Sequence, residues 1–208
     1  MKNLAAEFLS LTDKKLARVI EQVGPCALKP RRGVQPWQPL VRSVAFQQLN
    51  GNAAQTIFNR FLALFPETKF PTPQQIIRAT DAKLRSAGLS GAKTAAIKDI
   101  AAKTITGVVP DRRAIAKLSD AEIIERLTTI RGVGPWTVEM LLMFTLGRPD
   151  VLPVTDYGVR NGFAVVYGLK EFPSPKELFA YGERWKPYRS AAAWYLWRAV
   201  DLAREKAK

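Results

Sequence analysis

Histidine is absent from the 208-residue chain, and cysteine occurs once, at Cys26. Structural zinc fingers, zinc deaminases and cysteine-ligated iron–sulfur clusters need several ligands of these two kinds, so the sequence excludes all three. Ser-His-Asp and Cys-His catalysis are excluded for the same reason. Any chemistry must rest on carboxylates, lysines, tyrosines or backbone groups, and we expect Cys26 to be an inert apolar residue.

Long apolar runs are missing too. No segment has the roughly 20 apolar residues that cross a bilayer, and the first residues lack the apolar stretch of a signal peptide. The expectation that follows is a cytoplasmic protein.

Acidic residues are scarce beside basic ones. The chain has 32 Lys and Arg against 18 Asp and Glu, which gives a net charge of +14 and a pI near 10.2. Such an excess favours a polyanionic partner, either nucleic acid or an anionic membrane. A soluble basic protein without such a partner is the alternative that charge alone leaves open.

Helical patterns cover most of the chain. A Gln or Glu follows three positions after each of Thr72, Ser119 and Ser174. This spacing is typical of a capping box at the start of a helix. Strand signals are limited to Val108-Val109 and Val151-Leu152. Apolar residues at helical spacing predict helices over Asp13 to Val23, Leu40 to Leu49, Ala53 to Phe65, Ser90 to Thr106 and about Pro187 to Ala207.

These patterns predict an all-α fold. The length suits one domain or two small lobes, and we expect two helical lobes that flank a cleft. One lobe covers about residues 37–150, and the other combines residues 1–36 with 151–208. Two similar turns, Gly88 to Lys93 and Arg131 to Pro135, are expected in the first lobe.

A Gly-Val-Gly turn lies between two of the helices, in the string Ile130-Arg-Gly-Val-Gly-Pro135. Its two glycines permit positive φ and expose backbone N–H groups. A helix that begins at Pro135 adds free N–H groups and its dipole, and together these suit an anion such as a DNA phosphate. A simple helix–helix connector is the alternative interpretation of the same glycines.

A lone carboxylate follows the second helix of this pair, at Asp156 in Leu-Pro-Val-Thr-Asp. It lies at or near a helix N-terminus, where the helix dipole stabilises negative charge. Such a carboxylate can stabilise an oxocarbenium-like sugar and orient water, as in glycoside hydrolysis. Asp156 or Thr155 could instead serve only as the helix cap.

The segment from Leu127 to Phe163 resembles the helix-hairpin-helix, Gly/Pro-rich loop and aspartate signature of the DNA glycosylase superfamily, called HhH-GPD. The twenty-residue step from Trp136 to Asp156 and the string from Arg184 to Trp197 are similar to its alkylbase branch, DNA-3-methyladenine glycosylase II. Val41 to Asn50 is similar to the Gln-Gln-Leu/Ile segment of the family. The resemblance runs from about Trp37 to Trp197 and is to the compact form, without an N-terminal β-rich domain.

The resemblance implies a base-excision repair enzyme. It would flip an alkylated purine, such as 3-methyladenine or 7-methylguanine, out of double-stranded DNA and hydrolyse its N-glycosidic bond, with Asp156 as the catalytic residue. No catalytic cofactor is implied, and we expect a nucleoid-associated monomer. Preference among alkylated and deaminated bases stays open.

Aromatic faces attract a cationic base, so the resemblance assigns the substrate pocket to Trp136, Tyr188 and Met140, with Trp37 as a weaker candidate. Ordinary core packing is the alternative for each, and it is the preferred interpretation for Trp194 and Trp197.

The resemblance also assigns DNA contacts. Gln48 or Leu49 would fill the gap that the flipped base leaves, and Asn50 would touch the minor groove, unless it is only a helix C-cap. Phosphates would be held at Gly132, Gly134, Trp136 and Thr137, with Arg131 and Lys93 as additional candidates. The carbonyls of Thr128, Ile130 and Gly132 would hold a structural Na⁺ or K⁺.

Two other functions remain possible at this stage. One is a non-catalytic DNA-binding protein that uses the hairpin as a phosphate clamp. The other is a bifunctional glycosylase/lyase for oxidised bases, but Trp136 occupies the position where lyase-competent relatives carry a Schiff-base lysine.

Overall fold

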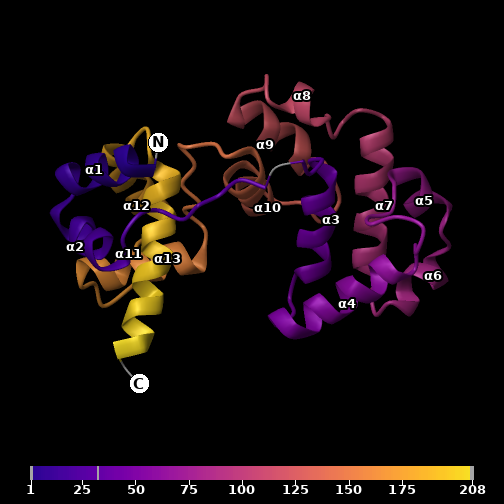
Figure 1. Cartoon of the computed structure of the whole chain (residues 1–208), viewed down its shortest axis with the longest axis horizontal. Helices are drawn as coiled ribbons and strands as arrows, with labels where there is room; N and C mark the ends of the chain where they lie inside the picture. Colours follow the sequence, from indigo (N-terminus) through magenta and orange to yellow (C-terminus); the bar gives the residue numbers. More distant parts are fainter. Residues whose placement is uncertain (1, 32, 207–208) are drawn as a thin grey trace. The chain divides into compact units, whose positions relative to one another are not determined.

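The structure is a computed structural model that describes residues 2–31 and 33–206. Within these residues it contains helices, turns and bends but no strand, which confirms the all-α prediction (Figure 1). Val108-Val109 and Val151-Leu152 are irregular. The α-helices are α1 (Lys2–Thr12), α2 (Lys14–Val23), α3 (Trp37–Phe46), α4 (Gly51–Ala63), α5 (Pro73–Arg78), α6 (Asp81–Ser86), α7 (Gly91–Ile105), α8 (Arg112–Ile115), α9 (Asp120–Thr128), α10 (Pro135–Leu141), α11 (Tyr157–Tyr167), α12 (Pro175–Gly182) and α13 (Arg189–Lys206), with a π-helical segment η1 (Leu142–Leu146) and a 3₁₀ turn η2 (Glu183–Trp185).

The predicted start signals are the ones that the helices use. Thr72, Ser119 and Ser174 each accept a hydrogen bond from the amide three residues later and complete a capping box. Each box satisfies two backbone N–H groups that the first helical turn leaves without partners. Local chemistry therefore fixes where α5, α9 and α12 begin.

None of the helices in the described part of the chain is both long and apolar enough to cross a membrane.

The chain forms two compact units. Unit 1 combines the residues up to Pro30 with those from Leu142 onward, and unit 2 is Arg31–Leu141. The expected lobe boundaries were at about 37 and 150. Residues 31–36 therefore belong to unit 2 and not to unit 1, and residues 142–150 belong to unit 1 and not to unit 2.

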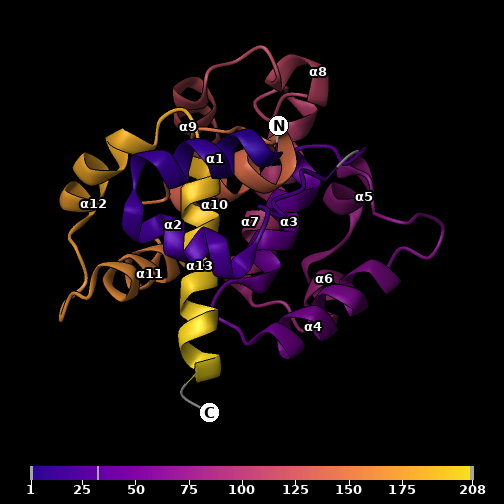
Figure 2. The same cartoon turned by 60° about the vertical axis from the view of Figure 1, so that its left-hand side comes forward.

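Unit 1 is built on the pair α11 and α13, which lie side by side in Figures 1 and 2. Gly162 permits this approach, because a Cβ there would lie 2.0 Å from the carbonyl oxygen of Leu196. The helix α2 packs on both members of this pair, and α1 packs on α2 and α13.

A buried carboxylate joins these helices. Asp13 caps α2 and is 4% exposed. It accepts hydrogen bonds from the hydroxyls of Tyr167 and Tyr181 and from Nε1 of Trp185 at 3.0 Å. Burial by itself raises the pKa of Asp13, but the hydrogen bonds from Tyr167, Trp185 and two backbone N–H groups outweigh this effect, so the pKa lies below its ordinary value. Burial and Asp13 raise the pKa of Tyr167.

Unit 2 is organised around α7, which contacts α3, α5 and α6 (Figure 2). Ile97 and Ile100 of α7 are fully buried. Leu40 and Val44 of α3 are at most 1% exposed. These side chains recur at helical spacing, so the apolar periodicity of the sequence determines which face of each helix is buried.

Candidate functional site

Asp156 is the N-cap of α11 in unit 1. Its Oδ1 accepts the backbone N–H of Val159 at 2.7 Å and Nε1–H of Trp197 at 2.8 Å. The residue is half-buried. Asp156 therefore caps the helix, as one interpretation of the sequence expects, and it also keeps a partly exposed carboxylate.

Trp197, which the sequence analysis assigned to the core, is a further candidate site residue, because it contacts Asp156. It is half-buried on α13, stacks on Phe144 with ring centroids 5.8 Å apart, and directs its indole N–H at Asp156. Gly158 leaves room for the indole, because a Cβ there would lie 2.7 Å from Cδ1 of Trp197. The two partners are 41 residues apart in the chain, so no local pattern could reveal the pair.

Two further aromatic residues of unit 1 were singled out. Tyr188 directly precedes α13, is half-buried and packs edge-on against Phe8 with ring centroids 5.4 Å apart. Trp194 is also half-buried and packs against Tyr195. Tyr188 therefore keeps an accessible surface, and Trp194 is not fully in the core.

The hairpin of unit 2 is α9, the turn Thr129–Gly134 and α10. In this hairpin turn only Gly132 has positive φ, at +74°, whereas Gly134 does not. A Cβ on Gly132 would approach Cβ of Ala96 to 3.1 Å. Among the residues that the structure describes, the amides of Gly132 and Gly134 donate no hydrogen bond. The turn therefore offers two N–H groups to an anion.

The helix α7 braces this turn. The backbone N–H of Arg131 donates to Oδ2 of Asp99 at 2.7 Å, and the ammonium of Lys103 donates to the carbonyl of Thr129. The amide of Arg131 is thus already used inside the protein. Its side chain is exposed and stays a candidate phosphate contact.

The first residues of α10 differ in exposure. Trp136 is 42% exposed, and Met140, one turn later, is half-buried. Thr137 is 4% exposed, so its side chain is buried. Only its backbone remains a candidate contact for the phosphate. Trp37, at the start of α3, is 8% exposed and packs edge-on against Phe70, so the structure assigns it to the core of unit 2.

The segment Gln47–Asn50, which we call the wedge loop, joins α3 to α4. The helix α3 ends three residues before the expected Leu49, because Gln47 has a non-helical ψ of 137° and Gln48 then adopts φ +55°. Asn50 is the N-cap of α4 and accepts the amide N–H of Ala53 at 2.9 Å, so the alternative of a helix C-cap is wrong. Gln48 and Leu49 stand exposed at the tip.

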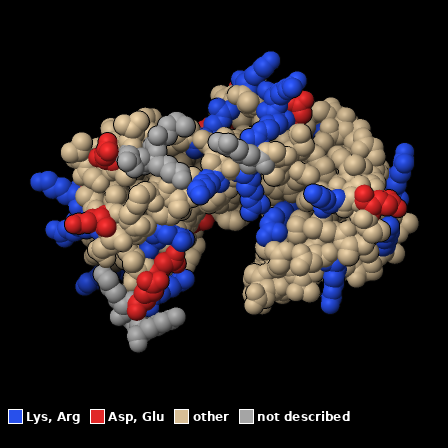
Figure 3. All heavy atoms as spheres, in the orientation of Figure 1, with Lys and Arg blue, Asp and Glu red and all other residues tan. Residues whose placement is uncertain are grey.

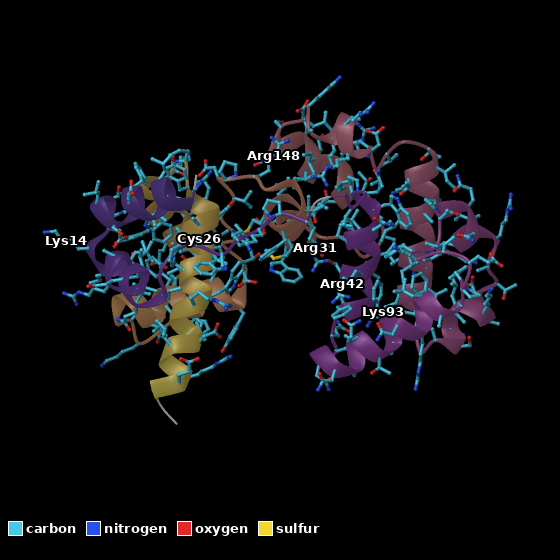
Figure 4. All side chains as sticks on the ribbon, viewed as in Figure 1. Lys14, Cys26, Arg31, Arg42, Lys93 and Arg148 are labelled. Atoms are coloured by element: carbon cyan, nitrogen blue, oxygen red, sulfur yellow. The ribbon has the colours of Figure 1, made fainter. Side chains whose placement is uncertain are left out.

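Gln47, which the sequence analysis did not single out, connects the wedge loop to the hairpin turn. Its Nε2 donates to the carbonyl of Gly132 at 2.9 Å. Lys93 is half-buried, and its ammonium donates to the carbonyl of Ala45 at 2.9 Å (Figure 4). Burial lowers the pKa of Lys93. This lysine therefore serves the fold of unit 2, which was not expected.

The expected cation ligands are partly engaged. The carbonyl of Ile130 accepts the amide of Val133 at 3.1 Å, and that of Gly132 accepts Gln47. A carbonyl oxygen has two lone pairs, so each can still face a cation. Backbone carbonyls are a suitable donor set for a hard monovalent ion.

On the face drawn in Figure 3, Lys and Arg outnumber Asp and Glu over unit 2, while residues of other kinds cover most of the surface. This distribution agrees with the net charge of +14 and favours a polyanion.

Comparison with known proteins gives a family. The family model described as HhH-GPD superfamily base excision DNA repair protein matches residues 41–187. DNA-3-methyladenine glycosylase 1 of Schizosaccharomyces pombe is 41% identical over 198 residues, which cover 94% of this chain and 86% of the relative.

Solved structures agree. The S. pombe 3-methyladenine DNA glycosylase Mag1 in complex with abasic DNA has a TM-score of 0.86 at 40% identity and covers 96% of this chain and 97% of its own. The DNA-3-methyladenine glycosidase of Bacillus halodurans has a TM-score of 0.84 at 36% identity, covering 95% and 89%. The chain belongs to the HhH-GPD superfamily of base excision DNA repair proteins.

Proposed function

We propose that this protein is a monofunctional DNA glycosylase that hydrolyses the N-glycosidic bond of alkylated purines, with Asp156 as the catalytic residue. The products are the free base and an abasic site. The observation that carries the proposal is the carboxylate of Asp156, oriented by Val159 and Trp197 in a chain that has no histidine. The relatives described above are named as glycosylases, which favours an enzyme over a non-catalytic DNA-binding protein.

The chemistry requires negative charge near the sugar. When the bond between C1′ and the base breaks, the sugar develops oxocarbenium character, and a carboxylate stabilises it electrostatically. Water then adds to C1′, and Asp156 accepts its proton. A base alkylated at a ring nitrogen is already cationic and leaves without strong acid catalysis, so a missing histidine costs such an enzyme little.

Recognition of the cationic base rests on aromatic faces. Trp136 and Tyr188 both keep exposed surface, and Met140 lies one turn after Trp136. A cation over an aromatic ring gains about 0.5–2 kcal/mol, which discriminates alkylated purines from neutral ones. Trp37 has no part in this proposal, because it packs against Phe70.

DNA binding rests on unit 2. The amides of Gly132 and Gly134 and the first turn of α10 would hold a phosphate, with the exposed side chain of Arg131 beside them. Gln48 or Leu49 would enter the duplex where the base has left, and Asn50 would face the minor groove. These contacts position the duplex and carry no base specificity.

A structural monovalent cation at the carbonyls of Thr128, Ile130 and Gly132 is part of the proposal. It would stabilise the hairpin without taking part in the chemistry. A melting temperature that is equal in K⁺, Na⁺ and choline buffers would contradict it.

The test is base release from N-methylated DNA, scored over duplexes with 3-methyladenine, 7-methylguanine, ethenoadenine or hypoxanthine. We expect 3-methyladenine or 7-methylguanine to be released and an intact abasic strand to remain. Borohydride should trap no covalent complex, since Trp136 cannot form a Schiff base. DNA binding without release of any base would mean a binding protein instead.

The expected oligomeric state is a monomer, and size-exclusion chromatography with light scattering checks it. A mass near twice 23.2 kDa would contradict this part of the proposal.

A further inference from the structure

The wedge loop is held in place by two hydrogen bonds that the catalytic proposal does not use. At its start, the side-chain amide of Gln47 donates to the carbonyl of Gly132. Just before it, the ammonium of Lys93 donates to the carbonyl of Ala45, in the last turn of α3. Both are 2.9 Å long and both lie within unit 2.

The same helix that carries Lys93 also supports the hairpin turn. Ala96 is the nearest neighbour of a Cβ at Gly132, Asp99 accepts the amide of Arg131, and Lys103 donates to Thr129. Positions 93, 96 and 103 follow each other at steps of three and seven residues, which places them on one face of a helix. One face of α7 therefore contacts both the base of the wedge loop and the hairpin turn.

The loop also contains a backbone conformation that needs support. Gln48 has φ +55°, the one positive value among non-glycine residues in the described parts of the chain. Such a conformation is about 1 kcal/mol or more above the ordinary regions and persists where the surroundings fix it. The bonds of Gln47 and Lys93 and the cap at Asn50 lie on both sides of Gln48 and can supply that constraint.

We propose that Gln47 and Lys93 are positioning residues, which hold the wedge loop at a fixed distance from the phosphate-binding hairpin turn. A duplex bound at the hairpin turn would then meet Gln48 and Leu49 already in position. Binding of the strand and eversion of the base would therefore occur together, without a rearrangement of the loop. This inference rests on the proposed function. It also reassigns Lys93, whose ammonium stays on Ala45 and does not hold a phosphate.

Two substitutions remove the bonds and keep side-chain length. Gln47→Met removes the amide donor, and Lys93→Met removes the ammonium. Gln74→Met on α5 and Lys98→Met on α7 are matched controls, since Gln74 is exposed and Lys98 pairs with Asp81 at the surface. Lys93→Arg is the conservative variant, because its guanidinium can still donate to Ala45.

Excision is measured under single-turnover conditions on a duplex with one 7-methylguanine. Base unstacking is measured separately by the fluorescence of 2-aminopurine beside a tetrahydrofuran abasic-site analogue, without any chemical step. Gln47→Met and Lys93→Met should each slow excision about three- to tenfold, as loss of one hydrogen bond allows, and should lower the fluorescence increase. Because each lost bond costs only about 0.5–1.5 kcal/mol, their melting temperatures should lie within about 5 °C of those of the controls, and Lys93→Arg should recover most of the rate.

Salt dependence separates positioning from phosphate binding. A lysine on a phosphate contributes about 0.9 to the slope of log affinity against log salt concentration. Lys93→Met should leave that slope unchanged, and a slope shallower by about one would return Lys93 to the phosphate contacts and overturn the proposal for it.

The two proposals fail in different ways. If the unaltered protein excises 7-methylguanine but Gln47→Met matches the controls in rate and fluorescence, the positioning role of Gln47 is wrong and the glycosylase stands. If the unaltered protein releases no base from any substrate, the proposed function is wrong. The fluorescence readout then still tests the loop, and unchanged unstacking in both variants would reject the positioning role as well.

Discussion

At the scale of single residues, the orientation of Asp156 depends on a partner distant in sequence. Both of the hydrogen bonds described here go to Oδ1, one from its own helix and one from Trp197. The indole of Trp197 adds a second hydrogen bond to the cap bond on Oδ1, so it helps to fix the direction of the carboxylate. Trp197 is thus a positioning residue for the proposed catalytic group.

Trp197→Phe keeps an aromatic ring beside Phe144 and removes the donor. A hydrogen bond to a charged group contributes about 1.5–3 kcal/mol, so we expect excision to slow by about 10–100-fold while DNA affinity changes little. Single-turnover kinetics and fluorescence anisotropy measure the two quantities. Trp194→Phe on the same helix is the control, and equal effects from both variants would mean general damage to α13.

Asp13 makes a prediction about stability. Asp13→Asn turns an NH₂ group toward the donors of Tyr167, Tyr181 and Trp185, so we expect a loss of about 2–3 kcal/mol. Because the pKa of Asp13 is lowered in the fold, its stabilisation is present above the unfolded pKa of about 4 and is lost as pH falls through the folded value.

Thermal unfolding from pH 7 to pH 3 measures the Asp13 effect. The difference in melting temperature between the natural protein and Asp13→Asn should shrink below about pH 4. Asp201→Asn, which breaks an exposed ion pair with Arg198, is the control and should stay within about 0.5 kcal/mol. A difference independent of pH would contradict the role of the charge.

At the scale of elements, the hairpin turn depends on Gly132. An alanine there meets a left-handed backbone and Ala96 at 3.1 Å, so Gly132→Ala should lose about 1–2 kcal/mol and weaken DNA binding several-fold. Gly107→Ala is the matched control, since Gly107 has φ +81° with open space around it. Gly107→Ala should lose stability but keep DNA affinity. An equal loss of DNA affinity in the two variants would contradict a role of the hairpin turn in DNA binding.

The sequence correctly predicted where helices begin when the capping residues lie near one another in the chain. The capping boxes at Thr72, Ser119 and Ser174 began helices as expected. The end of α3 was predicted wrongly, because nothing in the string Phe-Gln-Gln-Leu-Asn indicates that the helical conformation stops at Gln47. The contacts that Gln47, Lys93 and Trp197 make could not be predicted, because their partners lie 85, 48 and 41 residues away and only the folded chain brings them together.

At the scale of the whole molecule, the excess of positive charge makes DNA affinity depend on salt. Each phosphate that the protein neutralises contributes about −0.9 to the slope of log affinity against log salt concentration. A hairpin turn together with a basic surface should give a slope steeper than about −2, measured by anisotropy with an undamaged duplex. A slope shallower than about −1 would mean that the charge is not used in binding.

The proposed function depends on Asp156 acting in the chemical step and not in folding or DNA binding. The most direct measurement compares the natural protein with Asp156→Asn for release of 7-methylguanine and, in parallel, for affinity to a duplex with an abasic-site analogue. We expect the rate of release to fall by at least about 100-fold while affinity stays within about threefold and the α11 cap is kept by the amide oxygen. Release at the natural rate, or loss of affinity equal to the loss of rate, would contradict the account.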